Sequence, residues 1–211
     1  MRAAEPRRPR LSSYSVLYTK YCFILNFLLD KKFLWFVAKF LGLFVLFYYG
    51  TIAIIGLAAP GGSYSPFVAK YLDYVSWIKH SLIAGTAWLV GLFGYSTVKE
   101  PGFLIRITGG RGVFIAMSCV GYGVYSFWAA FVLSNNGTAF KKTAWVIGGL
   151  LLLWIINVGR ISMFLVAINK NKTMPLGIDH HDWFTMIAYA FIFGMIYLYD
   201  KTNRRKELYA N

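Results

Sequence analysis

The sequence predicts an all-α polytopic integral membrane protein with about four to six membrane segments. The chain has 211 residues, of which 58% are hydrophobic and only 14% are charged, and its mean hydropathy is +0.54. Several apolar runs are uninterrupted, and Ala144 to Ile168 alone is long enough to cross a hydrocarbon core of about 30 Å as a helix. A soluble domain of this size lacks the charged surface to cover such runs. We predict one transmembrane domain over residues 33–199, between a basic segment at 1–32 and a basic tail at 200–211.

The net charge of +14 indicates membrane orientation rather than nucleic-acid binding. Most of the basic residues lie near the two ends and in short loops, where positive charge holds segments at the cytoplasmic face. A nucleic-acid surface would have aromatic residues among its basic clusters. Here the aromatic residues lie in the apolar runs instead. We therefore expect a lipid bilayer as partner and no nucleic acid. Residues 1–10 are predicted to be a cytoplasmic tail, and Leu11 to Leu29 an amphipathic helix on the inner surface.

The N-terminal half contains one clear span and several weaker segments. Phe33 to Ala59 is predicted to run from the inner to the outer side. Ser65 to Lys79 mixes polar and aromatic residues and is predicted to lie at the interface. Ser81 to Tyr95 is apolar but short, and an ordinary crossing there would conflict with the basic loops, so we expect a re-entrant or surface-lying segment. In Val98 to Val113, glycine and proline interrupt β-prone residues, which indicates a small hairpin.

The C-terminal half predicts three further spans. Cys119 to Leu133 runs inward, and Lys141 and Lys142 mark the following loop as cytoplasmic. Ala144 to Ile168 returns outward, Asn169 to Asp182 forms a polar outer loop, and Trp183 to Tyr199 is the last span.

This topology brings Cys119, Arg160 and the pair His180 and His181 to about the same outer depth. Arg160 is the only fixed charge in its span, where an arginine costs about 2.5–3.5 kcal/mol unless it has a partner or faces water. Asn157, three residues earlier, shares its helix face. Cys119 opens one span at the outer side, and His180 and His181 directly precede another.

A thiol, an imidazole and a guanidinium together suit nucleophilic acyl transfer. A neighbouring histidine or positive charge activates the thiol of Cys119, and the histidine returns a proton to the leaving amine. Arg160 offers donors to the oxyanion. Gly121 and Gly123 leave the helix surface bare, so that a substrate backbone can approach. Each residue also has a plain explanation: a packing cysteine, a snorkelling arginine, interfacial histidines and glycines that allow close helix packing.

Three motifs resemble those of the exosortase/archaeosortase family: SCVGYG around Cys119, NVGR ending at Arg160, and HHDWFT beginning at His180. Their order and the β-prone segment before the cysteine also resemble that family. The similarity covers roughly Trp88 to Tyr199, and the short length and the HHD form resemble the small exosortases of Bacteroidetes-type bacteria.

The resemblance implies a cysteine protease-like transpeptidase in the bacterial inner membrane, with its site facing the periplasmic side. Its partners would be exported proteins with a C-terminal sorting tail: a short motif, an apolar helix and a basic end. Cys119 would cleave at the motif and hold an acyl-enzyme, Arg160 would polarise the scissile carbonyl, and a histidine would act as acid and base. The acceptor, an amine or water, stays open. We expect no cofactor and no metal, because Cys22 and Cys119 show no ligand spacing.

The chain departs from the family pattern at two positions. Val120 stands before Gly121 where the family often has serine or alanine. The family's histidine commonly has a glycine four residues later; here Thr185 follows His181 at that distance, and a phenylalanine follows His180. The smaller threonine favours His181, with His180 as the alternative.

Two other functions remain open on the sequence. A non-catalytic membrane scaffold for envelope polysaccharide or protein export would use Arg160 to bind a lipid phosphate or a partner helix. A small transporter would use Arg160 and the histidines as an anion or proton path. Only the enzyme needs the thiol of Cys119.

Overall fold

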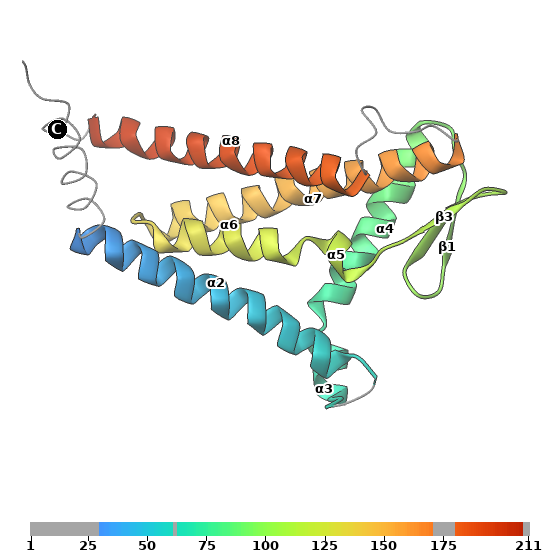
Figure 1. Cartoon of the computed structure of the whole chain (residues 1–211), viewed down its shortest axis with the longest axis horizontal. Coiled ribbons are helices and arrows are strands. Elements are labelled where there is room, and N and C mark those ends of the chain that lie inside the picture. The colour runs from blue at the N-terminus through green and yellow to red at the C-terminus, as the bar shows by residue number, and fades with distance from the viewer. Residues whose placement is uncertain (1–29, 61–62, 171–179, 209–211) are drawn as a thin grey trace, which may run out of the picture.

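The computed structural model describes residues 30–60, 63–170 and 180–208. The predicted tail at 1–10 and surface helix at Leu11 to Leu29 lie outside these residues. The described chain is mostly helical, with a small antiparallel sheet. Four helices lie roughly along the long axis of the molecule, and the sheet lies at one end (Figure 1). These helices are α2 (Lys31–Ala58), α6 (Tyr122–Ser134), α7 (Ala139–Asn169) and α8 (His180–Leu208).

Helix α2 has one half-buried aromatic stripe and leaves most of its other surface exposed. Asp30 caps its first turn by accepting a hydrogen bond from the Lys32 amide at 3.0 Å. An aromatic residue recurs at every fourth position and packs on α6, for example Phe40 on Phe127 with ring centroids 5.3 Å apart. Several large apolar side chains of α2 are exposed; that of Trp35, for example, is 64% exposed. The helix is long and apolar enough to cross a membrane, as predicted for Phe33 to Ala59.

Helix α7 is the second helix with the length and composition to cross a membrane. It contains the predicted span from Ala144 but begins earlier, so Lys141 and Lys142 lie in its first turn and not in a loop. The Lys142 ammonium donates to the Leu133 carbonyl of α6 at 3.0 Å. Farther along, α7 packs closely on α6, because Gly149 leaves room for the fully buried indole of Trp128.

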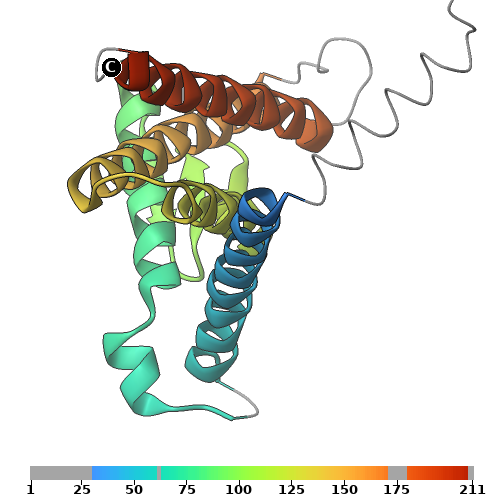
Figure 2. The same ribbon diagram turned by 90° about the vertical axis from the view of Figure 1, so that its left-hand side faces the viewer.

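Helix α3 (Pro66–Tyr71) leads into α4 (Tyr74–Leu92), which runs across the long helices near one end (Figures 1 and 2). The predicted boundary after Lys79 is wrong. No helix-breaking residue stands there, and the predicted interfacial and re-entrant segments are largely one helix. At the crossing with α7, a Cβ on Gly85 would lie 2.9 Å from a methyl carbon of Val158, so only glycine fits without a shift.

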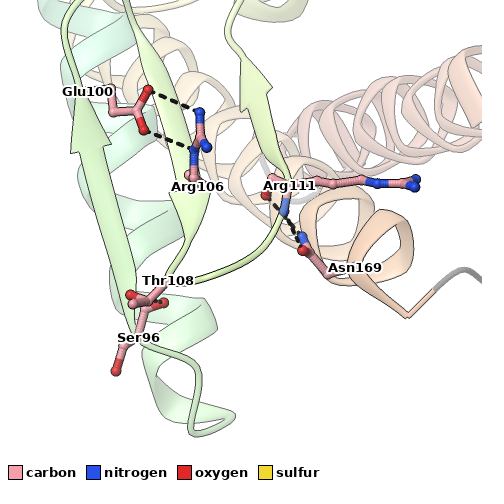
Figure 3. Close-up of polar contacts among 6 residues, drawn as sticks. All are labelled: Ser96, Glu100, Arg106, Thr108, Arg111 and Asn169. Atoms are coloured by element: carbon pink, nitrogen blue, oxygen red, sulfur yellow. Dashed lines mark hydrogen bonds and ion pairs between the residues drawn. The ribbon is translucent and has the colours of Figure 1, made fainter.

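The predicted hairpin is a three-stranded antiparallel meander of β1 (Thr97–Glu100), β2 (Leu104–Ile107) and β3 (Gly112–Phe114). Its residues alternate as a half-buried sheet requires, because Ile105 and Ile107 are buried while Arg106 points outward. Arg106 forms an ion pair with Glu100 on the neighbouring strand, with 2.9 Å between Nε and Oε1 (Figure 3).

The sheet, α4 and the second half of α7 share one apolar core. It contains the buried residues Leu82, Ile83, Val90, Ile105, Ile107, Val113, Ile115, Val158, Ile161 and Leu165. The Asn169 side chain ties the sheet to the end of α7: it accepts from the Arg111 amide at 2.7 Å and donates to the Arg111 carbonyl at 3.1 Å (Figure 3). The sheet is therefore fixed to the helix that carries Arg160.

Helix α8 is longer at both ends than the predicted span from Trp183 to Tyr199. It includes the basic residues Lys201 to Lys206, which continue the helix instead of forming a separate tail. Its inner face joins a second core with α6 and α7, built around Trp128 and Tyr199. Most of the predicted outer loop, residues 171–179, lies outside the described residues.

Candidate functional site

Cys119 lies in a separate short helix, α5 (Met117–Val120), and not in the first turn of the predicted span. Gly121 separates α5 from α6 by adopting a left-handed conformation with φ 75° and ψ 26°. This conformation is costly for residues with a Cβ, so glycine ends α5 and lets α6 start in a new direction. The break removes the helical donors that the carbonyls of Cys119 and Val120 would otherwise receive.

Two side chains of α7 replace those donors. The Asn157 amide donates to the Cys119 carbonyl at 2.7 Å and to the Val120 carbonyl at 3.2 Å. The Arg160 guanidinium donates to the same Cys119 carbonyl at 2.8 Å. The predicted shared face of Asn157 and Arg160 is therefore confirmed, and three of the predicted site residues lie together. The contact is to the backbone of Cys119, which fixes the nucleophile candidate in place.

Arg160 keeps most of its hydrogen-bonding capacity. A guanidinium has five N–H donors, and the Cys119 carbonyl is its one acceptor among the described residues. No carboxylate in the described part of the chain forms an ion pair with it. Its side chain is partly exposed. The remaining donors are therefore available to an anionic or carbonyl group beside Cys119.

The bare surface predicted after Cys119 is found at Gly121 but not at Gly123. Gly121 has open space around it, with no atom within 4 Å of a Cβ built there, but its main effect is the helix break. At Gly123 a Cβ would lie 3.5 Å from the Tyr48 ring of α2, so that surface is covered by α2 and is not bare.

Tyr125 contributes a polar group that the sequence analysis missed. Its hydroxyl is buried and has no hydrogen-bond partner among the described residues. It lies beside the Asn157 side chain and within electrostatic range of Arg160. The position on α6, one turn after the break at Gly121, turns the hydroxyl toward these two groups. The residue was overlooked because tyrosine is common in the apolar runs of this chain.

Lys79 is the second residue that the sequence analysis missed. Its side chain is only 3% exposed, and its ammonium lies 4.4 Å from the centre of the Phe103 ring. Burial lowers the pKa of Lys79 from its usual value, while the negative charges of Asp73 and of a Cys119 thiolate act in the opposite direction. Helical spacing of Val75, Lys79 and Leu82 was the signal that could have placed the lysine on a buried stripe.

The thiol of Cys119 is free and partly exposed, and the residue packs against the core formed by the sheet, α4 and α7. The neighbouring residue Val120 lines a cavity of about 420 Å³, to whose lining Cys119 itself does not contribute. The cavity lies between α2, α4, α6 and α7, and apolar and aromatic side chains dominate its lining, with the Thr51 and Tyr74 hydroxyls hydrogen-bonded to each other there. The lining residues are Phe47, Thr51, Tyr74, Val75, Ile78, Val120, Tyr122, Tyr125, Ser126, Ala129, Leu150 and Trp154. Such a cavity suits apolar side chains.

The predicted histidines stand at the beginning of α8, which starts at His180. The side chains of His180 and His181 lie outside the described part of the structure. The histidine whose side chain is described, His80 of α4, packs against Phe103 with ring centroids 5.0 Å apart. Within the described residues no three His, Cys, Asp or Glu side chains gather where they could hold a metal ion.

A comparison of the chain with models of known protein families found no match, and comparisons with curated proteins and with solved structures found none either. The resemblance to the exosortase/archaeosortase family therefore rests on the three short motifs and their order.

Proposed function

We propose that this protein is a membrane-embedded cysteine protease or transpeptidase that acts on exported proteins at a C-terminal sorting tail. The observation that carries the proposal is the pair of hydrogen bonds from Asn157 and Arg160 to the Cys119 carbonyl. The cysteine motif and the arginine motif are far apart in the sequence, and an acyl-transfer site requires them side by side.

In the proposed reaction the Cys119 sulfur attacks the scissile carbonyl carbon, and a C–S bond forms as the carbonyl oxygen becomes an oxyanion. The free N–H groups of Arg160 stabilise that oxyanion, and the buried Tyr125 hydroxyl is a further donor on the same side. A histidine at the start of α8 takes the thiol proton as the S–H bond breaks, and gives that proton to the leaving amine as the C–N bond breaks. An amine or water then resolves the thioester and restores the thiol.

Several features support a substrate with an apolar helix. Helices α2 and α7 are long and apolar enough to cross a membrane, and α2 exposes apolar side chains along much of its length. The cavity at Val120 has an apolar lining and the volume for a few large side chains. A substrate helix that lies against these spans would bring its cleavage motif to Cys119. The sheet, α4 and the start of α8 lie at one end of the molecule, which we assign to the outer side of the bacterial inner membrane (Figure 1).

A non-catalytic scaffold is the second candidate, and one observation favours it. Both Asn157 and Arg160 bind the backbone of α5, and this contact stabilises the fold without any chemistry at the thiol. In a scaffold the Asn157 and Arg160 contacts matter, and the sulfur of Cys119 does not.

The test is processing in cells of a tail-bearing substrate that carries a C-terminal tag, in a strain without other such enzymes. We compare the wild-type protein with Cys119→Ala and Cys119→Ser, and use Cys22→Ser as the matched cysteine control. Each variant is quantified in the membrane fraction. The enzyme hypothesis expects cleavage to vanish in both Cys119 variants and to persist in the control. Unchanged cleavage with Cys119→Ser would exclude the thiol as nucleophile and favour the scaffold.

A further inference from the structure

Strand β3 is an edge strand of the sheet, and its hydrogen bonds show which residues face the open edge. The strand order is β1-β2-β3, so β3 pairs with β2 on one side only (Figure 3). In an antiparallel pair, residues that bond the neighbouring strand alternate with residues whose N–H and C=O groups point the other way. The Ile115 amide donates to the Phe103 carbonyl at 2.9 Å, so Ile115 is turned toward β2. Val113, two residues earlier and opposite Ile105, is turned the same way.

Gly112 and Phe114 therefore present their backbone groups on the open edge. The bonds on the other side of β2 agree with this alternation, because the Thr108 amide donates to the Ser96 carbonyl of the β1 side at 2.9 Å. The Phe114 carbonyl accepts from the Ala116 amide at 3.1 Å. Within the described residues, the Phe114 N–H and the N–H and C=O of Gly112 have no hydrogen-bond partner. These groups are free to bind another backbone.

The two edges of the sheet differ in how they are protected. Strand β1 carries the charged residues Lys99 and Glu100, and charges on an edge strand prevent it from pairing with another chain. Strand β3 carries no charge, and its exposed side chain is the apolar ring of Phe114, which is 56% exposed. An unprotected edge binds an extended peptide by adding it as a strand: main-chain bonds supply affinity, and side-chain contacts supply selectivity.

The position of β3 indicates which peptide it binds. The strand leads directly into α5, and Cys119 follows Phe114 by five residues. The Cys119 amide donates to the carbonyl of Ala116, the N-cap of α5, at 3.0 Å, so the connection is short and ordered. Two extended residues and one helical turn place the Cα atoms of Phe114 and Cys119 at most about 12 Å apart. About four residues of an extended peptide cover that distance. Helix α7, which carries Arg160, also contacts β3.

We propose that the cleavage motif of a sorting tail binds in extended form as a fourth strand on β3. Gly112 and Phe114 bond its main chain, and the Phe114 ring contacts one of its side chains. The adjoining residues then carry the scissile carbonyl to Cys119 and to the free donors of Arg160. A carbonyl inside a helix is already bonded within that helix, so the motif must be extended to be attacked, and β3 supplies the bonds that replace those of the helix. The inference rests on the proposed function and adds how the substrate is held.

The experiment is site-specific photo-cross-linking in cells, with the same tagged, tail-bearing substrate as the probe. The photoreactive amino acid p-benzoylphenylalanine replaces Phe114 in a Cys119→Ala chain, so that bound substrate is not consumed. The matched control carries it in place of Val98, which lies on the same face of the sheet at the opposite edge and is 48% exposed. We expect a cross-link from position 114 to substrate residues next to the cleavage site, and none from position 98.

A second measurement isolates the main-chain bond. Exchange of the Phe114 amide for an ester removes its N–H and keeps its side chain. In cleavage by the purified full chain in lipid nanodiscs, KM should rise about threefold to tenfold while kcat stays the same, because the bond holds the substrate equally before and during the reaction. The same exchange at Lys99, whose N–H faces the open edge of β1, should change neither constant.

The inference is overturned by equal cross-linking at both positions, by no cross-link to the substrate, or by a cross-link that stays within this chain, since another of its segments would then cover the edge. An unchanged KM in the Phe114 ester also overturns it, and this variant decides the question if the photoreactive variant does not reach the membrane. If Cys119→Ala leaves cleavage intact although the cross-link forms, the proposed function fails and the strand pairing stands. If Cys119→Ala abolishes cleavage and no cross-link forms, only the role of β3 fails.

Discussion

Gly148 and Gly149 are neighbours on α7 that differ completely in their surroundings. A Cβ on Gly149 would overlap the Trp128 indole and lie 2.7 Å from its Cδ1 atom. A Cβ on Gly148 would have no atom within 4 Å. Trp128 is fully buried and cannot move away without loss of contacts, since its indole N–H donates to the Trp145 carbonyl at 3.0 Å. Alanine at the two positions therefore probes packing of α6 on α7 with the same chemical change.

The expected effects have opposite signs. Overpacking at Gly149 costs about 1–3 kcal/mol, and loss of the indole hydrogen bond adds about 0.5–1.5 kcal/mol. The higher helix propensity of alanine stabilises the helix and offsets up to about 1 kcal/mol of this cost. Gly149→Ala should therefore lower the free energy of unfolding by about 0.5–4.5 kcal/mol, and Gly148→Ala should leave it unchanged or raise it by up to about 1 kcal/mol.

The assay is reversible unfolding of the purified chain in mixed micelles, followed by far-UV circular dichroism as the fraction of denaturing detergent rises. The two variants are compared at the same protein and lipid concentrations. An unfolding free energy of Gly149→Ala equal to or above that of Gly148→Ala would refute the packing of Trp128 on α7. Helix α7 positions Asn157 and Arg160, so under the proposed function the destabilised variant should also show weaker cleavage of a tail-bearing substrate.

Three further predictions follow from the site. Asn157→Leu removes the two hydrogen bonds that the Asn157 amide donates to the α5 carbonyls and should cost about 1–3 kcal/mol in the same unfolding assay, whereas an unchanged value would mean that these two hydrogen bonds contribute nothing. Gly121→Ala places a Cβ at φ 75° and should cost about 1–2 kcal/mol, measured against Gly148→Ala. Burial lowers the folded-state pKa of Lys79 below its ordinary value of 10.5. Between the folded-state pKa and 10.5 the unfolded chain binds more protons than the folded chain, so the free energy of unfolding of the wild-type chain should rise as the pH increases through this window. Lys79→Met should be more stable below this window and lack the rise; a parallel rise in the variant would assign it to another group.

The features that local chemistry determines were predictable from the sequence. The apolar runs of α2 and α7 were recognisable as helices. In lipid the backbone N–H and C=O groups of such a run must hydrogen-bond within the chain, and a helix achieves this. The sheet was indicated by glycine and proline between β-branched residues, although its first strand was not resolved from the loop. The spacing of Asn157 and Arg160 was sufficient to place them on one face, since three residues nearly complete a helical turn.

Features that depend on contacts between distant segments were not predictable. Lys79 and His80 resemble a boundary between two segments, but the packing of Phe103 and α7 buries the lysine inside one continuous helix. A glycine such as Gly121 fits both the interior of a helix and its end. The sequence alone does not indicate which of the two backbone conformations it adopts, and in the structure it is left-handed and ends α5. The partner of Arg160 was expected, but its identity as a backbone carbonyl depends on that break.

The break at Gly121 also decides which helix Cys119 follows when the bilayer changes. In the proposed membrane enzyme, helices would tilt as the bilayer became thicker or thinner, and a cysteine rigidly joined to α6 would then move away from Arg160. Here α5 is joined to α6 by a single glycine and bonded to α7 by Asn157 and Arg160. Cys119 is therefore held to α7 by two side chains and joined to α6 only through Gly121, so we expect it to follow α7. Cleavage should then vary little between vesicles of short and long acyl chains, and it should become sensitive to acyl-chain length once Asn157 is replaced by leucine.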